Sequence, residues 1–92
     1  MKTFVYPAVF IKDKENDDYK VLFPDLDLTT DGAFVEEAFL YAKEALKAYF
    51  VYAEKYELDY NMPSEFEPLR SCCKPNEIVL LVDAELTKKD LQ

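Results

Sequence analysis

The order of apolar and polar positions in the first third of the chain predicts three short β-strands. Residues 4–11 are rich in β-branched and aromatic side chains, which favours a strand. Pro7 has no backbone N–H, so we expect this strand to lie partly at a sheet edge. Residues 12–18 read as a charged turn. Residues 19–24 alternate as a half-buried antiparallel strand does, and residues 26–32 are expected to form the third strand.

Residues 34–58 carry the clearest periodic pattern, which predicts one long amphipathic helix. Its apolar residues recur three and four positions apart and form one wide stripe. The stripe comprises Val35, Ala38, Phe39, Ala42, Ala45, Leu46, Tyr49, Ala53 and Tyr56. Glu36 and Glu37 lie in the first turn, where the helix dipole favours negative charge. Tyr41 and Tyr52 fall at the edge of the stripe, as rim packing or as part of a contact surface.

The last third of the chain predicts a return connection and one more strand. Residues 59–77 contain three prolines and read as a turn-rich connection. Residues 77–83 are an apolar run with charged ends, which we interpret as a central strand buried on both faces. Residues 84–92 form a polar tail. The expected fold is therefore α+β in the order β-β-β-α-β: an antiparallel meander, one long helix on one face and a returning strand, in a single domain with its core in residues 4–83.

The charge of the chain points to a basic protein as partner. The formal net charge is −8 on 92 residues. Residues 13–31 hold seven acids against Lys14 and Lys20, so this segment alone carries −5. Phosphate binding draws on clustered Lys and Arg, so we expect no direct binding to nucleic acid. An acidic surface attracts a cationic protein instead.

Catalysis is disfavoured by the residue types present. The sequence contains no histidine, which removes the commonest general base and most zinc sites. Asp25 and Asp27 would share a strand face, and paired carboxylates can bind Mg²⁺ for nuclease chemistry. The first strand, however, holds no acid, and no Lys or Arg cluster stands ready for a phosphate backbone. We therefore expect no enzyme and no cofactor, with acids facing solvent or a partner; a divalent-metal nuclease is the competing hypothesis.

The cysteines and the N-terminus bear on the compartment. Cys72 and Cys73 are adjacent, and neighbouring cysteines seldom bond to each other. Two unpaired cysteines fit a reducing cytosol. The apolar stretch at the N-terminus runs for about eight residues before charges begin, too short to cross a membrane. We expect a cytoplasmic protein without membrane contact.

Five segments in order carry a family resemblance that covers residues 4–83. They are YPAVF, DDYKVLFPDLDLTTDG, EEAFLYAKEALKAYF, MPSEFE and IVLLVD. Together they resemble the HicB family of antitoxins. The resemblance implies a partly degraded RNase H-like fold whose usual role is to bind and block HicA, a small basic toxin that cleaves mRNA.

The chain departs from the family pattern in three places. Asp27-Leu28 stands where members often have Pro-Gly, and Gly32-Ala33-Phe34 lacks the side-chain cap that usually opens the helix. Many members also repress their own operon through a C-terminal DNA-binding domain. The sequence reaches Gln92 without such a segment, so we do not extend operon repression to this chain.

The resulting hypothesis is a non-enzymatic domain that covers the RNA-binding and catalytic face of a HicA-type toxin. The expected contact residues are Asp17, Asp18, Asp25, Asp27 and Asp31, with Tyr41 and Tyr52 as anchors at this surface or at a self-association surface. The alternative is an orphan HicB-like module that forms a homodimer or higher homo-oligomer, or regulates something other than a toxin.

Overall fold

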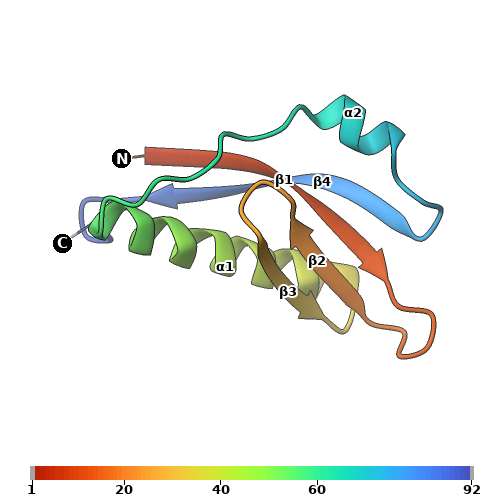
Figure 1. Cartoon of the computed structure of the whole chain (residues 1–92). Coiled ribbons are helices and arrows are strands. Elements are labelled where there is room, and N and C mark those ends of the chain that lie inside the picture. The colour runs from red at the N-terminus through yellow and green to blue at the C-terminus, as the bar shows by residue number, and fades with distance from the viewer. Residues whose placement is uncertain (1, 92) are drawn as a thin grey trace.

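A computed structural model describes residues 2–91 as one antiparallel sheet with a helix on each face. The elements in chain order are β1 (Lys2–Lys12), β2 (Tyr19–Phe23), β3 (Leu28–Gly32), α1 (Val35–Lys55), α2 (Phe66–Ser71) and β4 (Glu77–Leu86). The strand order across the sheet is β3-β2-β1-β4, and every neighbouring pair is antiparallel. Figure 1 shows α1 lying along one face while α2 passes over the other. The expected α+β arrangement, with three strands, a long helix and a returning strand, is confirmed.

β1 is the strand that joins the two halves of the sheet. It pairs with β4 from Lys2 to Ile11 but with β2 only from Val9 to Lys12. The first half of β1 therefore has one ladder partner, and Pro7 lies in that half. A residue without an N–H is tolerated there, so the expectation of a strand that lies partly at an edge is confirmed.

The core fills the space between α1 and one face of the sheet. From α1, the buried residues are Ala38, Ala42, Leu46, Phe50 and Ala53. Tyr6, Ala8, Phe10, Val21, Phe23, Val82, Ala84 and Leu86 face them from the strands. The ring of Phe50 stacks on that of Phe4, with centroids 3.9 Å apart. Sequence periodicity placed Tyr56 in the stripe and omitted Phe50, whereas Phe50 is fully buried and Tyr56 is 55% exposed.

β4 corrects one prediction. Residues 77–83 were expected to be a central strand buried on both faces, but β4 is an edge strand that pairs with β1 alone. Ile78 and Leu81 are 46% and 51% exposed. The strand also runs past residue 83, with Ala84 and Leu86 buried, so the segment taken for a polar tail begins inside the core.

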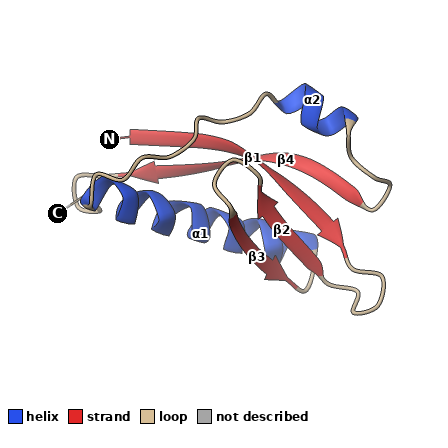
Figure 2. Ribbon diagram, viewed as in Figure 1, coloured by secondary structure: helices blue, strands red, loops and turns tan. Residues whose placement is uncertain are grey.

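Two local features of the chain differ from the sequence interpretation. The third strand begins at Leu28, and the residues before it form a turn in which Asp27 has φ 53°. The connection in residues 59–77, which the sequence predicts to be turn-rich, also contains the helix α2, which Figure 2 shows as a short helix above the sheet. Pro68 lies in its first turn, where the missing N–H has no intrahelical acceptor to lose.

Candidate protein-binding surfaces

The five predicted contact acids do not form one cluster. Asp17 and Asp18 come just before β2, and Asp31 lies opposite Lys20 in β3, so these three are at one end of the strand. Asp25 and Asp27 follow β2 and lie at its other end. A five-residue strand is about 17 Å long, so the two groups are separate sites on the surface.

The acids before β2 are fixed by their own turn. Asp17 adopts the left-handed conformation, φ 57°, which Asp tolerates, and its carboxylate lies 3.2 Å from the Lys12 ammonium. Asp13 supports the turn by accepting a 2.9 Å bond from the Glu15 N–H, which lowers the pKa of the Asp13 carboxyl. One carboxylate oxygen of Asp18 is buried without a hydrogen-bond partner among residues 2–91. The exposed acids of this turn are therefore Glu15 and Asp17, and Asp17 is the one of the predicted contact acids that is exposed there.

Asp25 has an internal role that the sequence did not reveal. One of its carboxylate oxygens accepts a 2.9 Å bond from the Ser64 N–H, and the other accepts the Ser64 hydroxyl. The Asn61 side chain donates to the Asp25 carbonyl at 3.0 Å, and the Tyr6 hydroxyl donates to the Asn61 carbonyl at 2.7 Å. Asp25 thus holds the connection between α1 and α2 against the β2–β3 turn. Burial of the Tyr6 hydroxyl raises its pKa.

A hollow of about 320 Å³ lies where that turn meets the connection. It is lined by Pro24, Asp25, Leu26, Asp27, Tyr49, Asp59, Tyr60 and Asn61. Asp27 and Asp59 are exposed there, so the hollow is acidic and open to solvent. No group of three or more Cys, Asp or Glu among residues 2–91 is arranged to hold a metal ion.

Tyr41 and Tyr52 belong to a different surface, which we call the outer helix face. It consists of the exposed side of α1 and its C-terminal end: Leu40, Tyr41, Glu44, Lys47, Ala48, Val51, Tyr52, Lys55 and Tyr56. Tyr41 is 44% and Tyr52 59% exposed. Because the buried stripe of α1 faces the sheet, this surface points away from the strands that carry the acids.

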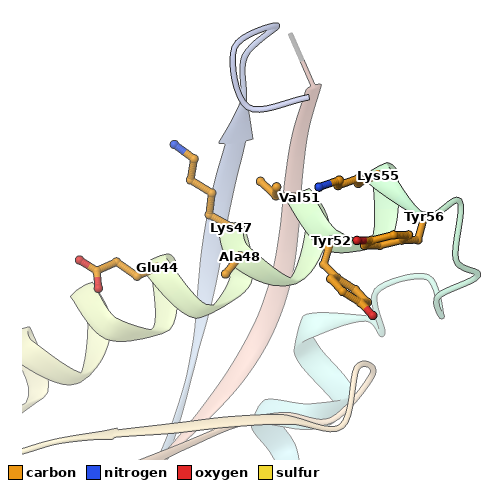
Figure 3. Close-up of a pocket in the computed structure, with 7 residues that line it drawn as sticks. All are labelled: Glu44, Lys47, Ala48, Val51, Tyr52, Lys55 and Tyr56. Carbon is orange, nitrogen blue, oxygen red and sulfur yellow. The ribbon is translucent and has the colours of Figure 1, made fainter. Parts of the chain in front are cut away.

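Part of the outer helix face is a shallow hollow of about 520 Å³ (Figure 3). Ala48 forms the low point of the helix there, with Glu44 and Tyr52 one turn away on either side. The rings of Tyr52 and Tyr56 pack together with centroids 4.7 Å apart, and the Lys55 ammonium lies 5.5 Å from the Tyr56 centroid. Sequence periodicity placed Tyr52 at the edge of the buried stripe and Tyr56 within the stripe, and it gave no sign of the hollow.

The remaining sequence features have structural roles or none. Cys72 and Cys73 are free thiols at the end of α2, and Cys73 donates to the Leu69 carbonyl at 3.4 Å. Within residues 2–91, neither helix is long and apolar enough to cross a membrane.

Comparison with known proteins identifies the fold but not a family. No family model matches the chain, and no curated protein matches it. A solved structure does: a chain described as "Toxin-Antitoxin complex from Streptococcus pneumoniae" is similar with a TM-score of 0.77 and 19% sequence identity. The similarity covers 91% of this chain and 70% of the other. At that identity the two chains share an architecture.

Proposed function

We propose that this chain is an antitoxin-type binding domain of the HicB kind, which neutralises a small basic HicA-type toxin. The observation that carries the proposal is the shared architecture with a chain of a toxin–antitoxin complex over 91% of the present chain. The motif order from YPAVF to IVLLVD supports it independently, because that order is a property of the sequence alone. We infer further that the domain is not an enzyme and acts by occupying the toxin's RNA-binding face.

Electrostatics supplies the reason for a basic partner. The chain carries −8, and Asp17, Asp27 and Asp31 are exposed. Complementary charge speeds diffusional encounter and disfavours other acidic partners. Once bound, the domain would compete with RNA for the same cationic surface of the toxin, so inhibition requires no chemistry on the antitoxin.

Because the acids lie at two separate ends of β2, the contribution of each group to partner binding can be tested by itself. Asp17 and Asp31 represent one end, and Asp27 beside the acidic hollow represents the other. Asp25 is left out of the test because its carboxylate holds Ser64, so its replacement would disturb the connection as well as the charge. Asparagine is the suitable replacement, since it removes the charge and tolerates the left-handed backbone of Asp17 and Asp27.

The decisive experiment is to search the adjacent reading frames for a small basic protein of the HicA type, which the proposal predicts, and to co-express it with this chain. We expect the two to co-purify and RNA cleavage by the basic protein to stop. Asp17→Asn with Asp31→Asn, or Asp27→Asn alone, should weaken binding by about tenfold at low salt and flatten its salt dependence. The matched control is Glu67→Gln with Glu85→Gln, which removes two exposed acids elsewhere.

Two results would count against the proposal. If the basic protein neither co-purifies nor loses activity, the antitoxin role is wrong. If the control variant weakens binding as much as the Asp variants do, binding depends only on net charge, and the acids at the ends of β2 are not the binding surface. A divalent-metal nuclease, the competing hypothesis, predicts RNA cleavage by this chain alone with Mg²⁺ or Mn²⁺.

A further inference from the structure

The outer helix face of α1 has a spacing that the toxin-binding proposal does not use. Tyr41, Glu44, Ala48, Val51 and Lys55 follow one another at intervals of three, four, three and four residues. Intervals of this kind keep side chains in one line along a helix, and they are the spacing found along the seam of paired helices. Here Tyr41, Ala48 and Val51 are the apolar members of the line, and Glu44 and Lys55 are its charged members. The line runs for about 21 Å, roughly four turns of helix. It lies on the side opposite the buried stripe. Val51 is half-buried and also packs against the core of its own chain, whereas the other four side chains of the line are exposed.

The line is self-complementary when two copies run antiparallel. If the two helices cross at a point between Ala48 and Val51, Ala48 of each copy packs beside Val51 of the other copy. These two equivalent contacts form the centre of the pair. One layer further out, Glu44 meets Lys55 of the second copy at both ends. A parallel arrangement would instead oppose Glu44 to Glu44 and Lys55 to Lys55, which is repulsive.

The side chains of Ala48 and of the tyrosines near the ends of the line also fit the antiparallel arrangement. Ala48 has the smallest side chain of the line, so it lets the two backbones approach at the crossing. One layer beyond Glu44, Tyr41 lies at the end of the line, where it faces the C-terminal end of α1 of the second copy, next to Tyr56. Tyr56 already packs on Tyr52 in a single chain, which reduces the rotamer freedom that is lost on binding. Tyrosine is also a residue type that protein interfaces favour.

We propose that the outer helix face binds a second copy of this chain, as an antiparallel α1–α1 pair across a two-fold axis. The edge strand β4 also exposes bulky apolar side chains, Ile78 and Leu81, and is a second candidate for contact between copies. Antiparallel self-pairing of β4 about Leu81 would set Glu77 opposite Glu85, and like charges in facing positions are destabilising. Charge therefore selects the helix face and not the sheet edge as the surface between copies.

This inference does not rest on the antitoxin role. The helix face and the acids at the ends of β2 are separate surfaces, so a dimer leaves the acids free for another partner. It assigns Tyr41 to the contact between copies. Because one helix face buries less area than the roughly 1,200 Å² of a small specific interface, we expect a weak dimer.

The test is sedimentation of the full chain between about 10 μM and 1 mM, the range in which a weak pair dissociates. The mass of the unmodified chain should rise from 10.7 kDa toward twice that value. Glu44→Lys should weaken self-association at least about tenfold, because it opposes Lys55 of the second copy. Lys55→Glu should do the same, and the double variant Glu44→Lys with Lys55→Glu should restore the dimer.

Glu36→Lys is the matched control, since it makes the same charge change at an exposed position of α1 outside the line and should leave self-association unchanged. Circular dichroism on each variant checks that the helix is intact. A chain that stays monomeric to 1 mM would overturn the proposal. So would a dimer that Glu44→Lys leaves intact, or a double variant that fails to recover while its fold is preserved, because each result contradicts the pairing of Glu44 with Lys55.

Discussion

At the scale of single residues, the one glycine of the chain sets how closely the sheet and the long helix approach. Gly32 ends β3 and is buried. A Cβ built at this position would lie 2.5 Å from the backbone nitrogen of Ala38 and 3.0 Å from the Ala38 Cβ. The first of these atoms belongs to the helix backbone and cannot turn aside. Gly32 is therefore required by contact with α1, and the conformation of its own turn is secondary.

Gly32→Ala should destabilise the chain by about 1–3 kcal/mol, because β3 or α1 must shift to make room for the methyl group. Urea unfolding followed by circular dichroism measures the change. Thr29→Ala, at an exposed position of the same strand, is the control and should change stability by less than about 0.5 kcal/mol. Equal effects from the two substitutions would show that the close contact with Ala38 is not what matters.

At the scale of elements, the N-terminus of α1 is closed by an acid one turn inside the helix. The N-cap residue Phe34 has an extended backbone and no side-chain cap, as the sequence predicted. Instead, the N–H of Ala33, the residue before the N-cap, donates to the Glu37 carboxylate at 2.9 Å, one residue earlier than the corresponding bond of a capping box. Glu36 and Glu37 both lie in the first turn and both favour the helix dipole, but only Glu37 makes this bond.

Glu37→Ala should therefore lower the free energy of unfolding by about 1 kcal/mol, and Glu36→Ala by less than half of that. The comparison separates the hydrogen bond from the dipole, since the two substitutions remove the same charge from the same turn. Thermal unfolding of the two variants at one protein concentration measures it. If Glu36→Ala costs as much as Glu37→Ala, the bond to Ala33 contributes nothing.

The turn after β4 is likewise stabilised by a carboxylate, that of Asp90, which accepts hydrogen bonds from Thr87. The Asp90 carboxylate accepts the Thr87 N–H at 2.8 Å and the Thr87 hydroxyl at 3.0 Å, and it lies 3.5 Å from the Lys47 ammonium. The hydrogen bond from the Thr87 backbone, and next the one from the Thr87 hydroxyl, lower the pKa of the Asp90 carboxyl below 3.8. Because the pKa of Asp90 is lower in the folded chain than in the unfolded chain, ionised Asp90 stabilises the turn at any pH above the ordinary aspartate pKa. That stabilisation is lost as the pH falls through the folded pKa.

An NMR titration of the Thr87 amide should accordingly follow Asp90, with a midpoint below 3.8. The amide should be unperturbed at neutral pH and should shift only as the carboxylate takes up its proton. In Asp90→Asn this transition should disappear, because asparagine does not titrate. A midpoint at or above 3.8 in the unmodified chain would contradict the assigned hydrogen bonds.

The elements also show where sequence reasoning succeeds. Alternation located β2, helical spacing located α1, and the order of elements was predicted because each pattern reflects burial of a single face. β4 was misplaced because an apolar run such as IVLLV is compatible with a central strand and with an edge strand that leaves Ile78 and Leu81 exposed. The role of Asp25 was missed because Ser64 is distant in sequence, and alternation carries no information on such contacts.

At the scale of the whole molecule, the last residues of strand β4 belong to the hydrophobic core. Ala84 and Leu86 are buried in the core, and Leu86 pairs with Lys2 at the far end of β1. The sequence interpretation ended the core at residue 83 because residues 84–92 are mostly polar. Composition does not reveal that two apolar side chains of this segment, Ala84 and Leu86, are buried.

A chain shortened to end after Asp83 should lose several kcal/mol of stability, at least the 2–5 kcal/mol that about one large buried side chain contributes. A chain ended after Lys88 keeps all of β4 and loses only the bonds of Asp90, so it should lose about 1 kcal/mol or less. Urea unfolding distinguishes the two. Similar midpoints for both shortened chains would mean that Leu86 is not part of the core.

The pairing of β1 with β4 also orders events in time. β1 is made well before its main partner β4, since Lys2 pairs with Leu86 and Ile11 with Glu77. On the ribosome, the hairpin of β1 and β2 needs only neighbouring residues and can form early, but half of β1 has no partner until β4 has emerged. Until then, the buried stripe of α1 has an incomplete sheet to cover it. The nascent chain is thus most open to misassociation just before β4 is made, and pairing of this ten-residue strand with β1 ends that interval.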